Sequence, residues 1–258
     1  MSTILFNEII YGPIKSRRLG SSLGVNLLPP NGKWCNFDCL YCECGFNKDG
    51  KDNRQIPARE DVRKSLERVL SNLSIKGDRI DSITFSGNGE PTMHPDFAAI
   101  IDDTIALRTK YKPEAKVSVL SNGSGIAKKE IVDALLKIEN PILKIDSAFD
   151  RTILLINRPA YAYSIRKLKH DLQPLSDRFV LQTMFLRGEF EGKTIDNTTP
   201  EEVEAWRALV DEIKPREIMI YTVDRETPAK NLCKVSVEEM NKFVAPLIEK
   251  GYKVKVSG

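Results

Sequence analysis

Four cysteines lie within a ten-residue stretch and are the residues with the clearest chemical potential. Cys35, Cys39 and Cys42 are separated by three residues and then by two, and Cys44 follows. Thiolates this close along a chain can converge on one inorganic centre, and soft thiolate ligands suit iron–sulfur clusters or zinc. In a reducing compartment, such a group indicates metal binding or catalysis rather than a disulfide framework.

Zinc is the alternative to an iron–sulfur cluster at these cysteines. A structural zinc site takes its further ligands from a second Cys or His pair downstream. Outside the stretch only Cys233, His94 and His170 remain, and they are not paired in that way. Cys44 is a candidate fourth ligand, but it follows Cys42 so closely that the chain would have to fold back sharply. The spacing therefore favours a cluster on three cysteines.

Two segments of small and polar residues follow predicted strands and are candidate ligand sites. Gly87 and Gly89 would let the backbone approach a ligand closely, and Glu90 can accept hydrogen bonds from an ammonium group. The same residues also suit an ordinary turn at the end of a strand. Ser121 and Asn122 end the next strand, where they can bind a ligand or cap the following helix.

Further charged residues are candidates for a site. Asp146 is expected to point inward at the end of a strand, where an acid is costly unless it is paired, so a role in a site competes with a capping role. Arg17 and Arg18 lie just before the first predicted strand and can bind an anion such as a phosphate or carboxylate. A solvated pair of surface arginines is the alternative, and the same choice applies to Arg158.

The elements that must position these residues alternate between short apolar runs and amphipathic stretches. The spacing predicts strands at residues 23–28, 82–85, 116–120, 142–146, 178–185, 217–223 and 252–256. Helices are predicted at 59–73, after Pro95, and at 126–138, 163–172, 200–213 and 235–249. This alternation predicts one domain over 1–258 with a parallel sheet. A barrel or partial barrel fits best, because the polar segments follow strands and would share one rim. The cysteines lie in the longest loop, about residues 29–57.

Composition sets few limits on function. Hydrophobic residues make up 41% and charged residues 29% of the 258 residues, which is typical of a soluble globular protein. The net charge of +3 neither requires nor forbids a nucleic-acid partner. No stretch has the apolar length of a membrane span or of a secretory signal, so we expect a cytoplasmic protein without a membrane partner.

The cysteine spacing, with an aromatic residue (Tyr41) directly before the last cysteine, resembles the signature of the radical S-adenosylmethionine (SAM) superfamily. In that family, three cysteines bind three irons of a [4Fe-4S] cluster, and the fourth iron is chelated by the amino and carboxylate groups of SAM. One electron cleaves SAM to methionine and a 5′-deoxyadenosyl radical, which abstracts a hydrogen atom from the substrate. The resemblance implies a partial (β/α)6 TIM-like barrel, with Cys35, Cys39 and Cys42 as the cluster ligands.

The later segments resemble the SAM-binding segments of the family in the same order. GNGEP resembles the Gly-Gly-Glu segment that holds the amino group of SAM, with Asn88 where the commonest form has glycine. LSNGS corresponds to the residues near the ribose and carboxylate of SAM, and QTMF to those that frame the adenine. On this resemblance, the expected SAM-binding residues are Tyr41, Gly87, Asn88, Gly89, Glu90, Ser121, Asn122, Asp146, Gln182 and Met184.

Segments along nearly the whole chain are similar to the Fe–S oxidoreductase group around the wyosine-tRNA synthesising enzymes. They are YGPIKSRRLG with SLGVNLLP, INRP, QTMF, the Asp196-Asn197 pair and YTVDR. Those enzymes carry a second cluster on additional N-terminal cysteines, whereas no cysteine precedes Cys35 here. The resemblance implies a short bacterial-type relative that lacks the second cluster. The expected substrate-side residues are Arg17, Arg18, Arg158, Asp196, Asn197 and Tyr221.

The predicted function is that of a radical SAM enzyme that acts on a nucleoside or a tRNA base. Its expected partners are SAM and an electron donor such as flavodoxin or ferredoxin. One alternative is a radical SAM activase or modifier of a polypeptide. Another, from a different class, is a metal-binding protein without catalytic activity. A basic rim around the site would favour RNA, and a long groove would favour a peptide.

Overall fold

The computed structural model describes residues 4–16, 18–49 and 55–258. These residues form two compact units, each made of separate chain segments. The N-terminal unit comprises Leu5–Cys35 and Asn47–Pro141, and the C-terminal unit comprises Asn36–Phe46 and Ile142–Gly258 together with Ile4. The cysteine loop therefore passes from one unit to the other between Cys35 and Asn36. That the whole chain is one domain stays a prediction.

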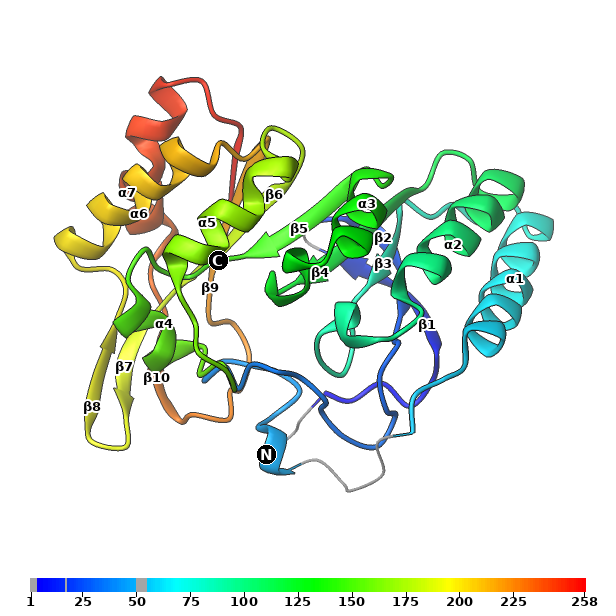
Figure 1. Cartoon of the computed structure of the whole chain (residues 1–258), viewed down its shortest axis with the longest axis horizontal. Helices are drawn as coiled ribbons and strands as arrows, with labels where there is room; N and C mark the ends of the chain where they lie inside the picture. The colour runs from blue at the N-terminus through cyan, green and yellow to red at the C-terminus, as the bar shows by residue number, and fades with distance from the viewer. Residues whose placement is uncertain (1–3, 17, 50–54) are drawn as a thin grey trace. The chain divides into compact units, whose positions relative to one another are not determined.

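The N-terminal unit contains four neighbouring strands of the eight-stranded main sheet, with helices after its parallel strands (Figure 1). Its strands lie in the order β1 (Ile10–Ser16), β2 (Gly20–Val25), β3 (Ser82–Phe85) and β4 (Lys116–Ser121). Its helices are α1 (Arg59–Ile75), α2 (Phe97–Tyr111) and α3 (Lys129–Leu136), with 3-10 turns η1 (Asn47–Asp49), η2 (Pro91–Met93) and η3 (Ser124–Ala127). β2, β3 and β4 pair in parallel as predicted, whereas β1 pairs antiparallel with β2 and was not predicted. Most β1 side chains are exposed, so this strand has no apolar alternation to reveal it.

The core of this unit follows the predicted apolar spacing. Val62, Leu66, Leu70 and Leu73 are the buried residues of α1, three and four positions apart on one face. All four residues of β3 are buried, as is usual for a parallel strand covered on both faces. Helix α2 packs beside α1, and its Phe97 ring meets that of Phe85 edge-on, with the centroids 6.3 Å apart.

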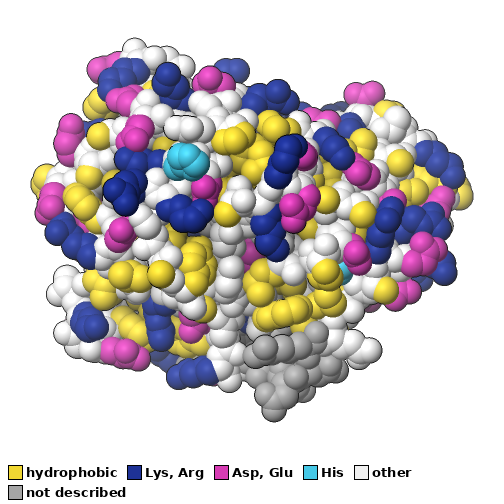
Figure 2. Space-filling view, viewed as in Figure 1, with side chains coloured by type: hydrophobic (Ala, Val, Ile, Leu, Met, Phe, Trp, Pro, Cys, Tyr) yellow, Lys and Arg dark blue, Asp and Glu magenta, His cyan; other side chains and the backbone are white. Residues whose placement is uncertain are grey.

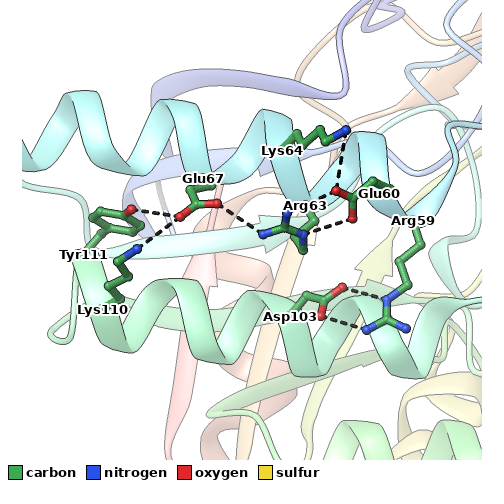
Figure 3. Close-up of polar contacts among 8 residues, drawn as sticks. All are labelled: Arg59, Glu60, Arg63, Lys64, Glu67, Asp103, Lys110 and Tyr111. Atoms are coloured by element: carbon green, nitrogen blue, oxygen red, sulfur yellow. Dashed lines mark hydrogen bonds and ion pairs between the residues drawn. The ribbon is translucent and has the colours of Figure 1, made fainter.

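Charged residues of both signs are interspersed over the face shown in Figure 2. Figure 3 shows one such group between α1 and α2. The Arg59 guanidinium donates to both oxygens of Asp103 at 2.7 and 2.9 Å. Glu67 accepts hydrogen bonds from Lys110 at 3.2 Å and from Tyr111 at 2.9 Å. Exposed ion pairs contribute little to stability, so we expect these charges to add little to the packing of the two helices.

The C-terminal unit contains a second set of parallel strands and a small separate sheet. The strand order is β5 (Asn140–Lys144), β6 (Val180–Phe185), β9 (Glu217–Thr222) and β11 (Val254–Ser257), all paired in parallel. Its helices are α4 (Asp150–Ile156), α5 (Ile165–Leu172), α6 (Pro200–Ile213) and α7 (Val237–Glu249), with the 3-10 turn η4 (Gln173–Leu175). The small antiparallel sheet has the order β10 (Asn231–Cys233), β7 (Arg187–Phe190) and β8 (Lys193–Asp196).

The hairpin β7–β8 and helix α4 were not predicted. The hairpin turn consists of Glu191 and Gly192, both with positive φ, 52° and 74°. Two such residues form the turn that matches the twist of a hairpin, so Glu-Gly between short alternating runs was an available signal. Helix α4 has only seven residues, too few for a helical periodicity to stand out. In the part of the chain that the structure describes, no helix is long and apolar enough to cross a membrane.

Candidate functional site

In the N-terminal unit, the segment after β3 packs tightly against the chain that enters the cysteine loop. A Cβ on Gly89 would lie 1.9 Å from the carbonyl oxygen of Trp34, and one on Gly87 would lie 2.6 Å from Oδ1 of Asn26. Both glycines have positive φ, 136° at Gly87 and 146° at Gly89. These two positions require glycine because the protein's own chain approaches them so closely.

Asn88, between the two glycines, makes hydrogen bonds to backbone groups of three other residues. Its side chain is fully buried and donates from Nδ2 to the carbonyl oxygens of Phe6 and Pro29, at 2.9 and 2.8 Å. Its Oδ1 accepts from the Phe6 N–H at 2.9 Å, and its backbone oxygen accepts from the Trp34 N–H at 2.8 Å. Asn88, which stands where the common Gly-Gly-Glu form has glycine, therefore fixes the start of the cysteine loop through these hydrogen bonds.

Glu90 is a buried carboxylate surrounded by neutral donors. Glu90 as a whole residue is 2% exposed. Oε1 accepts from the Thr92 N–H at 3.1 Å, the Thr92 hydroxyl at 2.6 Å and the Ser121 hydroxyl at 2.8 Å, while Oε2 accepts from the Asn122 N–H at 2.7 Å. Burial raises the pKa of Glu90, and the hydrogen bonds from Thr92, Asn122 and Ser121 oppose that rise. No Lys, Arg or His of the described residues forms an ion pair with Glu90.

Asn122 connects Glu90 to the first cysteine. Its backbone N–H binds Glu90, and its side-chain Nδ2 lies 3.7 Å from the Sγ of Cys35. Its Oδ1 accepts from the Ser124 N–H at 2.9 Å, which fixes the orientation of the amide. Gly123 is the N-cap of η3, so Asn122 lies one residue before the cap and its side-chain amide lies beside the first cysteine.

In the C-terminal unit, the cysteine loop is paired with the residues that follow α4. The Leu40 N–H donates to the Ile156 carbonyl oxygen at 2.9 Å, and the Asp38 N–H donates to that of Asn157 at 2.9 Å. The Ala160 N–H donates back to the Asn36 carbonyl oxygen at 2.8 Å. The INRP segment thus forms a short extended pairing with the loop, which the sequence did not predict.

Asp146 is the centre of a buried hydrogen-bond network in this unit. It is 1% exposed and accepts from the Tyr41 hydroxyl, from Asn157 Nδ2 at 2.6 Å and from the Met184 N–H at 2.8 Å. Asn157 Nδ2 also lies 3.4 Å from the Sγ of Cys39. Burial raises the pKa of Tyr41 well above its usual range, and the Asp146 charge adds to this, so the phenol stays protonated and donates.

Lys144 belongs to the same network and was not among the predicted site residues. Its side chain is 17% exposed, and its Nζ lies 3.3 Å from Asp146 Oδ1. Nζ also lies 4.4 Å from the centre of the Tyr41 ring and 4.6 Å from that of Tyr221, and it donates to the Tyr221 hydroxyl. Burial disfavours the charge, but Asp146 and Tyr221 outweigh this and raise the pKa of Lys144. The sequence did contain a signal for this role of Lys144, namely a lysine inside a buried strand, two residues before an acid.

Two buried polar atoms near this network lack a hydrogen-bond partner. They are Asn157 Oδ1 and Gln182 Nε2, on residues that are 2% and 5% exposed. Gln182 lies opposite Lys144 in the pairing of β5 and β6. Buried polar groups are normally satisfied, and each exception needs an explanation such as a ligand. Met184 is buried, and its backbone N–H is already bound to Asp146.

The predicted substrate-side residues lie in different elements of the two units. Asn197 is buried and braces the chain, because its Nδ2 donates to the Asp146 and Met184 carbonyl oxygens and its Oδ1 accepts from the Leu186 N–H. Asp196 accepts from the Thr198 N–H at 2.7 Å, an ordinary turn contact. Arg18 lies in the turn between β1 and β2, Tyr221 lies in β9, and Arg158 follows α4. Arg17 lies outside the described residues.

The cysteines form no disulfide. Three thiolates in one loop suit a cluster in which each thiolate binds a different iron, and amide donors approach the sulfurs of Cys35 and Cys39. Such outer donors are a usual feature of metal centres. Over residues 4–16, 18–49 and 55–258, no group of three His, Cys, Asp or Glu side chains is placed to hold a metal ion.

Comparison with known proteins supplies the family. The model of the radical SAM superfamily matches residues 32–193. A UPF0026 protein of Methanocaldococcus jannaschii is 28% identical over 243 residues, which cover 92% of this chain and 70% of that protein. A protein of Brachyspira hyodysenteriae named GTPase Obg is 29% identical over 235 residues, or 90% of this chain and 32% of the relative. An S-adenosylmethionine-dependent nucleotide dehydratase of Selenomonas ruminantium is 26% identical over 141 residues, or 53% of this chain and 45% of the relative.

Solved structures share the fold. A radical SAM methyltransferase from Sphaerobacter thermophilus has a TM-score of 0.68 at 15% identity, over 92% of this chain and 65% of that one. A structure of TYW1 with a lysine–pyruvate adduct bound has a TM-score of 0.59 at 16% identity, over 88% of this chain and 73% of that one. The chain thus spans about a third of the Brachyspira protein and 65% of the methyltransferase.

The expected fold class, a partial (β/α)6 TIM-like barrel of the radical SAM type, is confirmed by these structures. The expected cofactors, a [4Fe-4S] cluster and SAM, are those that the family uses. The three clustered cysteines and the segments around Glu90, Ser121, Asp146 and Gln182 all fall within the matched residues. The chain therefore belongs to the radical SAM superfamily.

Proposed function

We propose that this protein is an enzyme that cleaves SAM reductively and uses the resulting radical to abstract a hydrogen atom from its substrate. In this proposal Cys35, Cys39 and Cys42 hold the [4Fe-4S] cluster. Once reduced by a donor such as flavodoxin or ferredoxin, the bound cluster would supply the electron for the reductive cleavage of SAM. The contribution of the protein is to bind, orient and shield these groups.

The observation that carries the proposal is the environment of Glu90. A buried carboxylate is costly unless a positive charge compensates it. Neutral donors surround Glu90, and the described residues supply no cation for it. The amino group of SAM is a compact cation that can add charge-assisted hydrogen bonds at this carboxylate. Asn122 joins Glu90 to Cys35, so the ammonium site adjoins a cluster ligand within one unit.

The C-terminal unit offers complementary polar groups. Gln182 Nε2 is an unpartnered buried donor, and Asn157 Oδ1 is an unpartnered buried acceptor. We assign them to the adenosyl part of SAM, whose ring nitrogens and hydroxyls accept and donate hydrogen bonds. We assign Asp146 and Lys144 no direct contact with SAM. They hold the side chain of Tyr41, a residue that lies between the second and third cysteines in the sequence.

A nucleoside or nucleotide is the substrate class that we favour. A relative named as a nucleotide dehydratase supports it, as does the resemblance to the wyosine group. A long RNA is less favoured, because basic and acidic side chains alternate over the face in Figure 2 instead of forming a basic field. A salt titration of bulk tRNA binding tests this point. Strong binding that falls steeply with salt would favour tRNA, and a weak, flat response would leave nucleosides or polypeptides.

The test of the proposed function compares Glu90→Gln with Glu202→Gln. Glu202 is also a buried carboxylate held by hydroxyl donors, from Ser147 and Thr152, but none of its hydrogen bonds leads to a residue beside a cysteine. With cluster-loaded protein and dithionite, the wild type and Glu202→Gln should convert SAM to 5′-deoxyadenosine and methionine. Glu90→Gln should lose about 1.5–3 kcal/mol of SAM affinity with its fold intact. If the wild type forms no 5′-deoxyadenosine, the proposal fails.

A further inference from the structure

Among the described residues Arg158 has no carboxylate partner, unlike three other arginines of the C-terminal unit. In the C-terminal unit Arg151 pairs with Glu201 at 2.7 Å, and Arg225 pairs with Glu43 at 2.7 Å. Arg187 pairs with Glu239. For Arg158, by contrast, the described residues provide neither an ion pair nor a hydrogen-bond acceptor to the side chain, although it is half-buried.

Two aromatic rings hold the guanidinium of Arg158 instead. Its central carbon lies 5.4 Å from the centre of the Phe46 ring and 5.2 Å from that of Phe190. The two ring centres are 5.9 Å apart, so the three groups form a compact triangle. Contact with ring faces attracts the cation without using its N–H groups. The N–H groups therefore remain available for a planar anion, which they bind in pairs.

The backbone of Arg158 is also fixed. It has a positive φ of 49°, in the left-handed region, at the position after the α4 C-cap where glycine is usual. Its N–H donates to the Ile153 carbonyl oxygen at 3.2 Å, and its own carbonyl oxygen accepts from the Asp38 N–H at 3.2 Å. Pro159 follows and restricts the chain further. Arg158 is thus held in a backbone conformation that is unfavourable for arginine, and such strained residues are common at binding sites.

The position of Arg158 connects it to the cysteine loop. The preceding residue, Asn157, places its side-chain amide 3.4 Å from the Sγ of Cys39. Asp38, which binds the Arg158 carbonyl oxygen, directly precedes that cysteine. An anion held by Arg158 would lie beside the loop that carries the cluster ligands, where a substrate must be held for hydrogen abstraction.

We propose that Arg158 binds a carboxylate or phosphate group of the substrate, with Phe46 and Phe190 keeping its guanidinium in place. This inference rests on the proposed function for the identity of the ligand as substrate. It narrows the substrate to an acidic molecule, such as a nucleotide or a carboxylic acid, and disfavours a neutral nucleoside. An unpaired, preorganised arginine gains more from an anion than one that already has a carboxylate partner.

Arginine-specific labelling with phenylglyoxal tests the site in the cluster-loaded wild-type protein, with peptide mass spectrometry as the readout. Arg151 is the matched control, because its guanidinium also lies over a phenylalanine ring, Phe149 at 4.5 Å, but pairs with Glu201. The probes are inorganic phosphate and acetate, compared with chloride at equal ionic strength. We expect Arg158 to react faster than Arg151, and one of the two probes to slow its labelling by about threefold or more, as for a charge-assisted contact.

Each outcome has a defined meaning. Protection by phosphate alone indicates a phosphorylated substrate, and protection by acetate alone indicates a carboxylate. Protection by both supports an oxyanion of either kind, bound through two of its oxygens. Equal labelling of Arg158 with phosphate, acetate and chloride overturns the inference. In a parallel assay, 5′-deoxyadenosine formation reports on the proposed function, so its failure is distinct from failure of the anion site. The variant Arg158→Gln should also lose any thermal stabilisation by phosphate or acetate, whereas Arg151→Gln should keep it.

Discussion

Glu90 and Asp146 are two buried acids whose surroundings differ in one respect. Each follows a parallel strand, and each binds an asparagine, Asn122 or Asn157, whose side-chain amide lies near a cysteine sulfur. Asp146 has its cation within the chain, because Lys144 lies 3.3 Å away. Glu90 has only neutral donors among the residues that the structure describes.

This difference indicates different roles for the two acids, structural support for Asp146 and ligand binding for Glu90. The charge of Asp146 is balanced on folding, so its network can hold Tyr41 in place without any ligand. The charge of Glu90 stays uncompensated until a cation arrives, so the same kind of group becomes a recognition site.

Removing one of the three proposed cluster ligands should abolish the iron–sulfur centre. Cys35→Ala, Cys39→Ala and Cys42→Ala should each lose iron and sulfide completely after anaerobic reconstitution, because a cluster with one ligand fewer is not retained. Cys44→Ala and Cys233→Ala are the controls and should keep about four irons per chain. Iron and sulfide analysis with the visible spectrum measures this. Stoichiometric zinc without iron would contradict the assignment.

Replacing Lys144 should destabilise the protein, because Asp146 would be left buried without its cation. Lys144→Met should lower the free energy of unfolding by about 3–5 kcal/mol, and adding Asp146→Asn should restore part of the loss. Lys110→Met is the matched control, since Lys110 also lies over a tyrosine ring and pairs with a glutamate but is 61% exposed. It should have little effect. Urea denaturation measures all three, and equal losses for Lys144 and Lys110 would count against the contrast.

Glu90 should make stability and SAM binding depend on pH in opposite directions. Because burial raises its pKa, the native state keeps a proton that the unfolded chain has already lost. Between the ordinary carboxyl pKa and the raised value, stability should therefore fall as pH rises, by at most about 1.4 kcal/mol per pH unit. SAM affinity should rise over the same window, since the ammonium binds the ionised acid. Glu90→Gln should remove both slopes, as urea denaturation and calorimetric titration at several pH values can show.

The smallest expected effect concerns the two asparagine amides. Hydrogen bonds to cluster sulfurs stabilise the more negative, reduced state, so Asn122→Ala and Asn157→Ala should each lower the reduction potential of the cluster. One bond of about 1 kcal/mol corresponds to about 40 mV for a single electron. The Asn157 variant should shift more, because its amide lies at 3.4 Å rather than 3.7 Å from the sulfur. A redox titration followed by electron paramagnetic resonance measures both, and an upward shift would show that the amides act otherwise.

Some elements of the fold could be predicted from the sequence, and others could not. The parallel strands were predictable because their short apolar runs are local features, as in the fully buried β3 and β6. β1 and the hairpin β7–β8 escaped prediction because an exposed edge strand and four-residue strands have little periodicity of their own. The prediction of the three cluster ligands rests on their spacing, and that of Glu90 on its place within a glycine-rich turn; both stay predictions.

Tertiary structure decided what the neighbouring residues do. Asn88 and Asn197 were expected to face ligands, yet the contacts described for their side chains are to backbone groups. Lys144 gained importance only when folding placed it between two tyrosine rings. Residue types and short spacing in the sequence were enough to identify the family, and the predictions of the cluster ligands and of the order of the ligand-binding segments rest on them as well. Only the folded chain showed that Glu90 has no cation among the described residues and that Arg158 lies on the rings of Phe46 and Phe190, because these surroundings are assembled from segments far apart in the sequence.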